Sequence, residues 1–253
     1  MGPAVETKGK TMNNLTRYAV AAALIAVGMV VSSLLISRFL VRVRHEKEIK
    51  VKGFAEAQLT SDIGQLSATL YVQRTRRDEA YRVLKQQLRR VLLTLRHEAP
   101  SDAAFETRIP DFSAIYRLDA KGKRTNELEC YAGSMGFCVA SADVHWIKRR
   151  SADLVELIGE GLDIRVDEPV FLVSNLREVK LELLEKATAD GYRRAELMAN
   201  NSGSRVGALQ AARQGVFQIT EPNSTRTTSY GVYDTSTIRK SIRAVVTLEY
   251  AVE

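Results

Sequence analysis

The chain is poor in histidine and proline, and it lacks the short motifs that mark common catalytic and nucleotide-binding sites. The three histidines, His45, His97 and His145, show neither H-x-x-x-H nor H-E-x-x-H spacing, so no metal or other cofactor is predicted. The five prolines are scattered, and no low-complexity tract or long block of like charge is present. A long disordered tail is therefore not expected.

Motifs for nucleophilic catalysis and phosphate binding are also missing. Ser134 lies in Gly-Ser-Met-Gly, which is not the G-x-S-x-G of a nucleophile elbow. Neither G-x-x-x-x-G-K-[ST] nor G-x-G-x-x-G occurs, so nothing indicates a phosphate cradle. We therefore predict no catalytic residue and no enzymatic activity. A hydrolase with an unfamiliar site stays open as an alternative, with Asp62, Asp190 and Glu185 as its candidate residues.

Basic residues exceed acidic ones, with 37 Lys and Arg against 30 Asp and Glu, a formal charge of +7 and a pI near 9.4. Such a surplus favours anionic partners, including phospholipid headgroups, through long-range attraction. The arginines between Arg74 and Arg96 lack the aromatic interleaving of a single-strand groove, and no zinc-finger spacing is present. Nucleic acid is therefore not an expected partner, whereas an anionic lipid or polymer suits a basic helix face.

The most informative feature that is present is an uncharged, mostly apolar run from Tyr18 to Ser37. At about 1.5 Å of rise per residue, a helix of this length matches the hydrocarbon core of a bilayer. Apolar residues continue to Val41, so we predict a transmembrane signal anchor over residues 18–41. Its main apolar side chains are Tyr18, Leu24, Ile25, Val30, Leu34, Leu35 and Ile36. A cleaved signal peptide and a buried soluble helix are the alternatives.

The rest of the chain alternates between strand-like and helix-like patterns. Period-two alternation predicts strands over residues 48–59 and 66–73, and the Ser, Asp and Gly between them predict a hairpin. Apolar residues at three- and four-residue spacing predict an amphipathic helix from Asp78 to His97. We further predict short strands at 109–118 and 162–173, a helix at 151–158, a long helix from Asn175 to Asn201, and strands at 206–219 and 238–252.

Two strand-like stretches on either side of Ser134 predict a second hairpin, which would place Cys130 opposite Cys138. Directly opposite residues have Cβ atoms about 4.5–5.5 Å apart, which brings a disulfide within reach. Two free buried thiols and a redox-active pair remain open as alternatives. The polar segments at 119–125 and 221–236 are predicted as surface loops, the second of them mobile.

One ordered series of residues resembles a known family. Its members are Val51, Lys52, Gly53 and Asp62, then Ala187, Ala189, Asp190, Ala195 and Ala199, then Ser202, Gly203, Gly207 and Ala208, and finally Val246, Leu248, Tyr250 and Val252. In this order, over residues 48–253, they resemble the SIMPL-domain family of bacterial envelope proteins. The chain departs from that pattern at Ala55, where a second glycine is frequent, and at Phe137, where tyrosine is usual.

The resemblance implies an α+β fold of mainly antiparallel sheet with packed helices, no established catalytic residues, and assembly into closed rings in some members. It also implies orientation, which the basic residues on both flanks of the apolar run leave open. Residues 1–17, or a shorter tail from Met12, would be cytoplasmic, 18–41 would cross the bacterial inner membrane, 42–47 would link, and 48–253 would be one periplasmic domain.

The expected function is therefore that of a non-enzymatic, membrane-anchored scaffold or binding protein of the periplasm. It is expected to form homo-oligomers, and the resemblance implies a link to oxidative or envelope stress tolerance. A second hypothesis is a basic peripheral module that binds anionic lipid or an envelope polymer.

Overall fold

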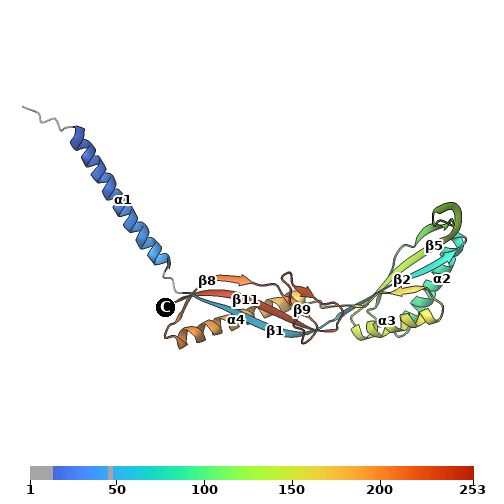
Figure 1. The fold of residues 1–253 in the computed structure, drawn as a ribbon. Helices are drawn as coiled ribbons and strands as arrows, with labels where there is room; N and C mark the ends of the chain where they lie inside the picture. The colour runs from blue at the N-terminus through green and yellow to red at the C-terminus, as the bar shows by residue number, and fades with distance from the viewer. Residues whose placement is uncertain (1–13, 45–47) are drawn as a thin grey trace, which may run out of the picture. The chain divides into compact units, whose positions relative to one another are not determined.

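The computed structural model describes the backbone of residues 14–44, the side chains of residues 18–37 and all of residues 48–253 (Figure 1). The chain divides into two compact units. One contains the described part of Met1–Lys50 together with Ala195–Ala211 and Glu249–Glu253, and the other contains Val51–Arg194 and Ala212–Leu248. The single periplasmic domain over residues 48–253 stays a prediction.

The helix α1 (Asn14–Arg44) includes the apolar run and extends beyond the predicted anchor at both ends. From Tyr18 to Ser37 it is long and apolar enough to cross a membrane, and none of this window is buried. The seven predicted anchor side chains are all more than half exposed. An anchor and a signal sequence share these properties. The tail up to residue 13, including Met12, and His45 in the predicted linker lie outside the described residues.

The first sheet has the strand order β1–β11–β9–β10, with β8 also paired to β11. Its strands are β1 (Glu48–Thr60), β8 (Val206–Gln214), β9 (Gln218–Thr220), β10 (Val232–Tyr233) and β11 (Arg239–Val252). The long helix α4 (Leu176–Asn201) runs beside β1 and β11 (Figure 1). Apolar residues alternate along β11, from Ile242 to Tyr250, and all those on the inward side are buried. One face of this sheet is therefore covered.

The second sheet has the order β3–β5–β2–β6, with β4 also paired to β5 and β7 to β2. Its strands are β2 (Ile63–Arg74), β3 (Ala104–Thr107), β4 (Asp111–Leu118), β5 (Arg124–Ser141), β6 (Ile164–Val166) and β7 (Val170–Leu172). All these pairings are antiparallel. With helices packed on mainly antiparallel sheets, the fold is α+β, as the sequence predicts.

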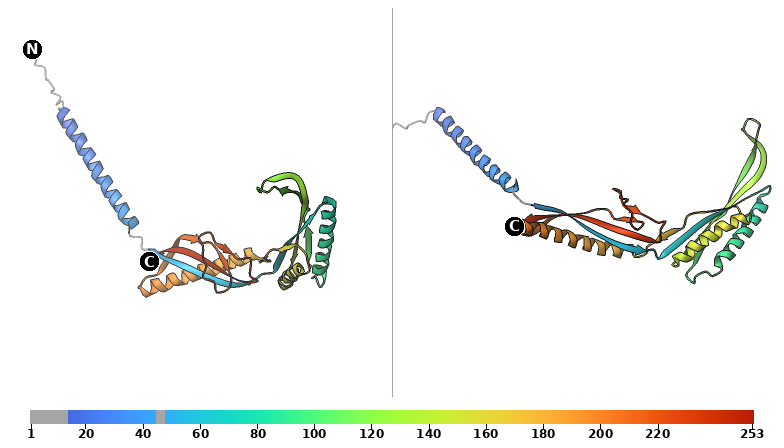
Figure 2. Two further views of the ribbon diagram at one scale, coloured as in Figure 1. Left: turned by 45° about the vertical axis from the view of Figure 1, so that its right-hand side comes forward. Right: turned by 60° about the horizontal axis from the view of Figure 1, so that its bottom comes forward.

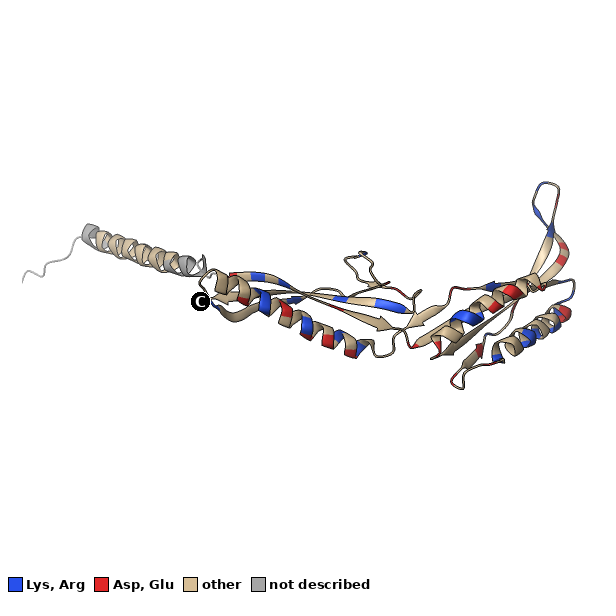
Figure 3. Ribbon diagram, turned by 90° about the horizontal axis from the view of Figure 1, so that it is seen from below, with Lys and Arg blue, Asp and Glu red and all other residues tan. Residues whose placement is uncertain are grey.

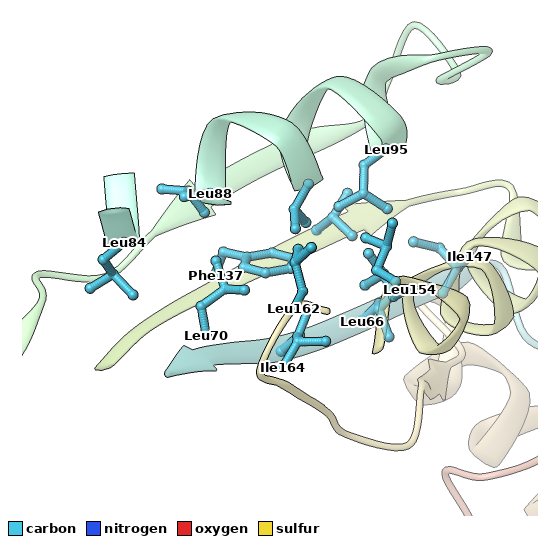
Figure 4. Close-up of a cluster of buried hydrophobic side chains, with 14 of the residues drawn as sticks. Leu66, Leu70, Leu84, Leu88, Leu95, Phe137, Ile147, Leu154, Leu162 and Ile164 are labelled. Atoms are coloured by element: carbon cyan, nitrogen blue, oxygen red, sulfur yellow. The ribbon is translucent and has the colours of Figure 1, made fainter. Parts of the chain in front are cut away.

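The helices α2 (Arg77–Arg96) and α3 (Val144–Gly159) cover one face of the second sheet (Figure 2). Leu84, Leu88 and Leu95 of α2 point toward Phe137 of β5, and α3 adds Ile147 and Leu154 (Figure 4). Most of these side chains are fully buried, and each such burial stabilises the fold by about 1.5–3 kcal/mol. This cluster is the largest apolar core of the described chain.

The predicted hairpin between the first two strands is wrong, because β1 and β2 belong to different sheets. The residues between them do not form a tight turn. The backbone NH of Ser61 donates to Ile238 O at 2.8 Å, and that of Asp62 donates to Leu172 O at 3.0 Å. The Asp62 carboxylate accepts hydrogen bonds from the backbone NH and hydroxyl of Ser174. The turn-forming residues therefore mark a change of sheet.

The hairpin centred on Ser134 is also wrong, since β5 is one continuous strand from Arg124 to Ser141. Its two glycines reflect close packing. A Cβ on Gly133 would lie 2.5 Å from the Phe112 ring, and one on Gly136 would lie 3.2 Å from Arg108 Cδ. A glycine in a strand can mark a place where another side chain packs closely against the backbone, and it does not by itself indicate a turn.

Other boundaries differ by smaller amounts. Asp143 caps α3 by accepting from Trp146 N, so this helix begins at Val144 rather than at 151, and His145 is helical rather than extended. The predicted strand at 162–173 is split into β6 and β7, and in β7 only Phe171 is buried. The predicted polar loop at 221–236 contains β10.

Candidate functional site

The candidate residues of the hydrolase alternative do not form one site. Asp190 accepts hydrogen bonds from Phe54 N at 2.8 Å and from Arg194 Nε at 2.8 Å, which lower its pKa. Asp62 has a lowered pKa because the Ser174 hydroxyl and backbone NH donate to its carboxylate. Glu185 is exposed on α4. Each of the two aspartates therefore joins separate backbone segments, which is a structural role.

Within residues 14–44 and 48–253, no group of three His, Cys, Asp or Glu side chains is placed to hold a metal ion. The two described histidines lie apart in sequence, His97 at the end of α2 and His145 in the first turn of α3.

Family-matching residues also have structural explanations. A Cβ on Gly53 would collide with the carbonyl oxygen of Ala187 and would lie 2.7 Å from Gly191 N, so only glycine lets α4 approach β1 here. Gly203 ends α4 with φ +71, and the backbone NH of Ser204 donates to Ala199 O at 2.9 Å. These residues of the ordered series set helix packing and helix ends.

The exposed side of α2 is strongly basic. From Arg74 to Arg96 the chain carries eight Lys and Arg but only two acidic residues, Asp78 and Glu79. Lys and Arg follow one another along α2, whereas on α4 they alternate with Asp and Glu (Figure 3). Four of these side chains, which we call the basic face, border one shallow hollow: Arg82, Lys85, Arg89 and Arg96.

The hollow on the basic face is partly apolar. It has a volume of about 630 Å³ and is also lined by Tyr81, Leu92 and Leu93. Leu93 is 64% exposed and Tyr81 is 44% exposed. Of the four cations, only Arg82 forms an ion pair within the described chain, with Asp78 at 2.8 Å. Positive charge around exposed apolar side chains suits an anionic surface with an apolar layer.

A second distinctive feature is the β4–β5 ribbon, formed by β4 and residues 124–134 of β5. β2 pairs with β5 only from Tyr131 onward, so the part of the ribbon with residues 124–130 continues beyond the rest of the sheet (Figure 2). In the part of the chain that the structure describes, β5 is the only strand paired with β4. The ribbon exposes Leu118 and Leu128 by 66% and 42%. It therefore offers unpaired backbone edges with apolar side chains on them.

The cysteines lie on β5 without meeting. Cys130 faces Ile115 across the ribbon, and Cys138 lies opposite Ser67 and Glu106. Eight residues of one strand separate them by about 26 Å, far beyond the span of a disulfide. Both are free and half-buried. The possible Cys130–Cys138 disulfide depended on a turn that does not exist, and the structure instead has the two free thiols of the alternative.

Sequence reasoning missed a buried ion pair. Lys240 is fully buried and its Nζ lies 3.4 Å from Asp234 Oδ2, while also donating to the carbonyl of Thr237. Burial lowers the pKa of Lys240, opposed by the charge of Asp234. Lys240 occupies an inward position in the same alternation as Ile242 and Ala244. A lysine at an inward position of a strand needs a buried partner, so the alternation of β11 could have indicated this ion pair from the sequence.

Comparisons with known proteins identify the family of the chain. A search of curated proteins finds no match to the chain. The model of one family, SIMPL, described as a protein of unknown function (DUF541), matches residues 49–250. This match includes both sheets and the helices α2, α3 and α4. Because it spans most of the chain, the protein belongs to the SIMPL family.

Proposed function

We propose that this protein is a non-enzymatic, membrane-anchored scaffold or binding protein of the bacterial envelope that self-associates through the β4–β5 ribbon. In this proposal α1 crosses the inner membrane and residues 48–253 lie in the periplasm. A role in oxidative or envelope stress tolerance follows the family resemblance. The observation that carries the proposal is the ribbon with its unpaired edges.

An exposed edge strand is a template for pairing with another chain, and natural proteins usually shorten, charge or cover such edges. β4 has eight residues and only two of them, Asp111 and Arg117, are charged. An isolated two-stranded ribbon is marginally stable in water. A second copy would satisfy the free backbone groups and cover apolar side chains such as Leu118.

The charges of β4 suit pairing with itself. In an antiparallel pairing of two β4 edges centred on Ala114, Asp111 of each copy lies opposite Arg117 of the other. Opposite charges at such positions stabilise a pair of strands by about 0.2–1 kcal/mol, and like charges destabilise it. The two-fold arrangement repeats the favourable pair, so the edge is self-complementary.

The test is the mass of the full chain in detergent micelles, measured by light scattering with the detergent contribution subtracted. We expect an oligomer that Asp111→Arg or Arg117→Asp weakens and that the double exchange restores. A matched exposed change, Arg89→Asp on α2, should leave the mass unchanged. A monomeric wild-type chain would overturn self-association, and an oligomer insensitive to all variants would remove the ribbon as its interface.

A second candidate function rests on the basic face of α2. Its cations surround exposed Tyr81 and Leu93, an arrangement that favours binding to an anionic lipid surface or an envelope polymer. We expect the full chain in proteoliposomes to bind added vesicles that contain phosphatidylglycerol, with affinity falling steeply as salt rises. Replacement of Lys85 and Arg89 by Gln should reduce this binding. Salt-independent binding would argue against it.

A further inference from the structure

A cavity in the larger compact unit combines three basic side chains with an apolar lining. Its volume is about 650 Å³. His145 and Lys148 reach it from the first two turns of α3, and Arg239 reaches it from the start of β11. The remaining lining residues are Thr60, Phe171, Pro222, Ser236, Thr237 and Ile238. No acidic side chain is among them.

The basic side chains of the cavity have no acidic partner. Within the described residues, Lys148, Arg239 and His145 form no ion pair. Asp143, close to His145 in sequence, accepts from Trp146 N, and Asp234 accepts from Ser236 and Thr237 and pairs with Lys240. Lys148 and Arg239 are therefore available to an anion.

Much of the remaining lining is apolar, which favours a ligand that carries an apolar group. Phe171 is buried, and Pro222 and Ile238 add further apolar surface. The hydroxyls of Ser236 and Thr237 already donate to Asp234. Polar contacts to a ligand would thus come mainly from the three basic side chains. An apolar group on the same ligand would bury its surface against this lining, which favours binding.

We propose that this cavity binds a small, soluble organic anion, in which a phosphate, sulfate or carboxylate group is attached to an apolar body of about one ring. The charged group lies between Lys148 and Arg239, and the apolar body lies against Phe171, Pro222 and Ile238. The bound anion joins α3 to the segment that enters β11. α3 packs against the second sheet and β11 belongs to the first, so the ligand stabilises the connection between them.

The experiment uses the full chain in an uncharged detergent and phenyl phosphate as the probe. Calorimetry measures the affinity, and fluorescence of Trp146 gives a second readout. This is the only tryptophan of the chain, it is buried, and it adjoins His145 in α3. Inorganic phosphate and phenol separate the contributions of charge and ring. The variants are Lys148→Gln and Arg239→Gln, with Lys186→Gln, an exposed change on α4, as the matched control.

We expect saturable binding of phenyl phosphate at one site per chain, and weaker binding of inorganic phosphate and of phenol. Each pocket variant should weaken the affinity by about tenfold or more, as expected for a hydrogen bond to a charged group. Lys186→Gln should bind as the wild type does. Absence of saturable binding, or equal affinity in the pocket and control variants, would overturn the proposal. Unchanged thermal unfolding would show that each variant is folded.

Discussion

Gly53 and Asp190 illustrate how single residues hold a long helix to a sheet in this protein. Gly53 allows the backbone of β1 to approach α4, and the Asp190 carboxylate accepts the next backbone NH, from Phe54, at 2.8 Å. Both residues are part of the ordered family series. At this scale, Gly53 and Asp190 are residues of the family pattern that explain how α4 packs on β1.

Gly53→Ala should therefore be strongly destabilising. The added methyl group collides with backbone atoms of α4, which cannot move without shifting the helix. We expect a loss of about 3 kcal/mol or an outright failure to fold, at the upper end of overpacking costs. Gly159→Ala is the control, because a Cβ there meets nothing within 4 Å. Thermal unfolding followed by circular dichroism measures both, and equal midpoints would contradict the packing argument.

The buried pair of Lys240 and Asp234 predicts unequal effects of removing each partner. Asp234→Asn leaves a fully buried ammonium without a counter-charge, and such losses cost about 3–5 kcal/mol. Lys240→Met should cost less, because Asp234 keeps its hydrogen bonds from Ser236 and Thr237. Denaturant unfolding of the two variants measures the difference. Equal losses would show that the charge pair does not control stability here.

Acid should destabilise the fold through its hydrogen-bonded carboxylates. Burial raises the pKa of Asp234, but hydrogen bonds from Thr237 and Ser236 and the charge of Lys240 outweigh it and lower the pKa to about 2 from 3.8. Asp62 and Asp190 are also lowered. Because the unfolded chain binds these protons more tightly, the stabilisation is complete above the ordinary value of 3.8 and declines as pH falls toward 2.

The measurement is the free energy of unfolding between pH 7 and pH 2, with Asp234→Asn for comparison. Asp234 alone should contribute about 2 kcal/mol to the decline. The variant should show a correspondingly smaller decline below the ordinary carboxyl range. An identical pH profile in both proteins would contradict the assignment to Asp234.

At the scale of elements, hydrophobic periodicity predicts the helices and strands better than turn-forming residues predict the hairpins. The alternations of β1, β2 and β11 and the helical spacing of α2 and α4 correctly indicate five elements. The two predicted hairpins are wrong because Ser, Asp and Gly occur in places other than tight turns. The segment around Asp62 passes from the first sheet to the second, and Gly133 leaves space for the ring of Phe112. Which strands pair depends on contacts distant in sequence, which local composition does not contain.

The continuous strand β5 predicts that Cys130 and Cys138 do not join within one chain. Protein unfolded in an alkylating reagent, without a reductant, should carry two alkyl groups by mass spectrometry. Reduction beforehand should not change this number. An intrachain link between the two cysteines would require β5 to be folded back on itself, and finding one would contradict the strand as described.

For the whole molecule, the fold class and the family could be predicted from the order of small residues, even though individual pairings could not. The candidate site could be predicted only in part: the basic side of α2 follows from composition, whereas the ribbon depends on where β2 ends. The cavity near Lys148 and Arg239 joins residues about ninety positions apart, and no local pattern indicates their proximity.

The proposed orientation predicts the behaviour of fusions to the C-terminus. Alkaline phosphatase fused after Glu253 should be active in bacterial cells, because this enzyme folds with its disulfides only in an oxidising compartment. A cytoplasmic reporter at the same place should be inactive. If α1 is retained as an anchor, intact mass of the mature chain should include residues 18–37. The opposite reporter pattern would place the domain in the cytoplasm.

The pairing of β1 with β11 has a consequence for how the chain acquires its structure. Lys50 and Glu249, which form an ion pair between these two neighbouring strands, are 199 positions apart in the sequence. Pairings of such high contact order form slowly, and β1 must wait for the last strand to be synthesised. The second sheet, with its partners between Ile63 and Leu172, can form earlier. Until β11 has been synthesised, β1 therefore stays unpaired, close in sequence to the membrane-length helix α1. A chaperone or a protease would act on the chain during this period.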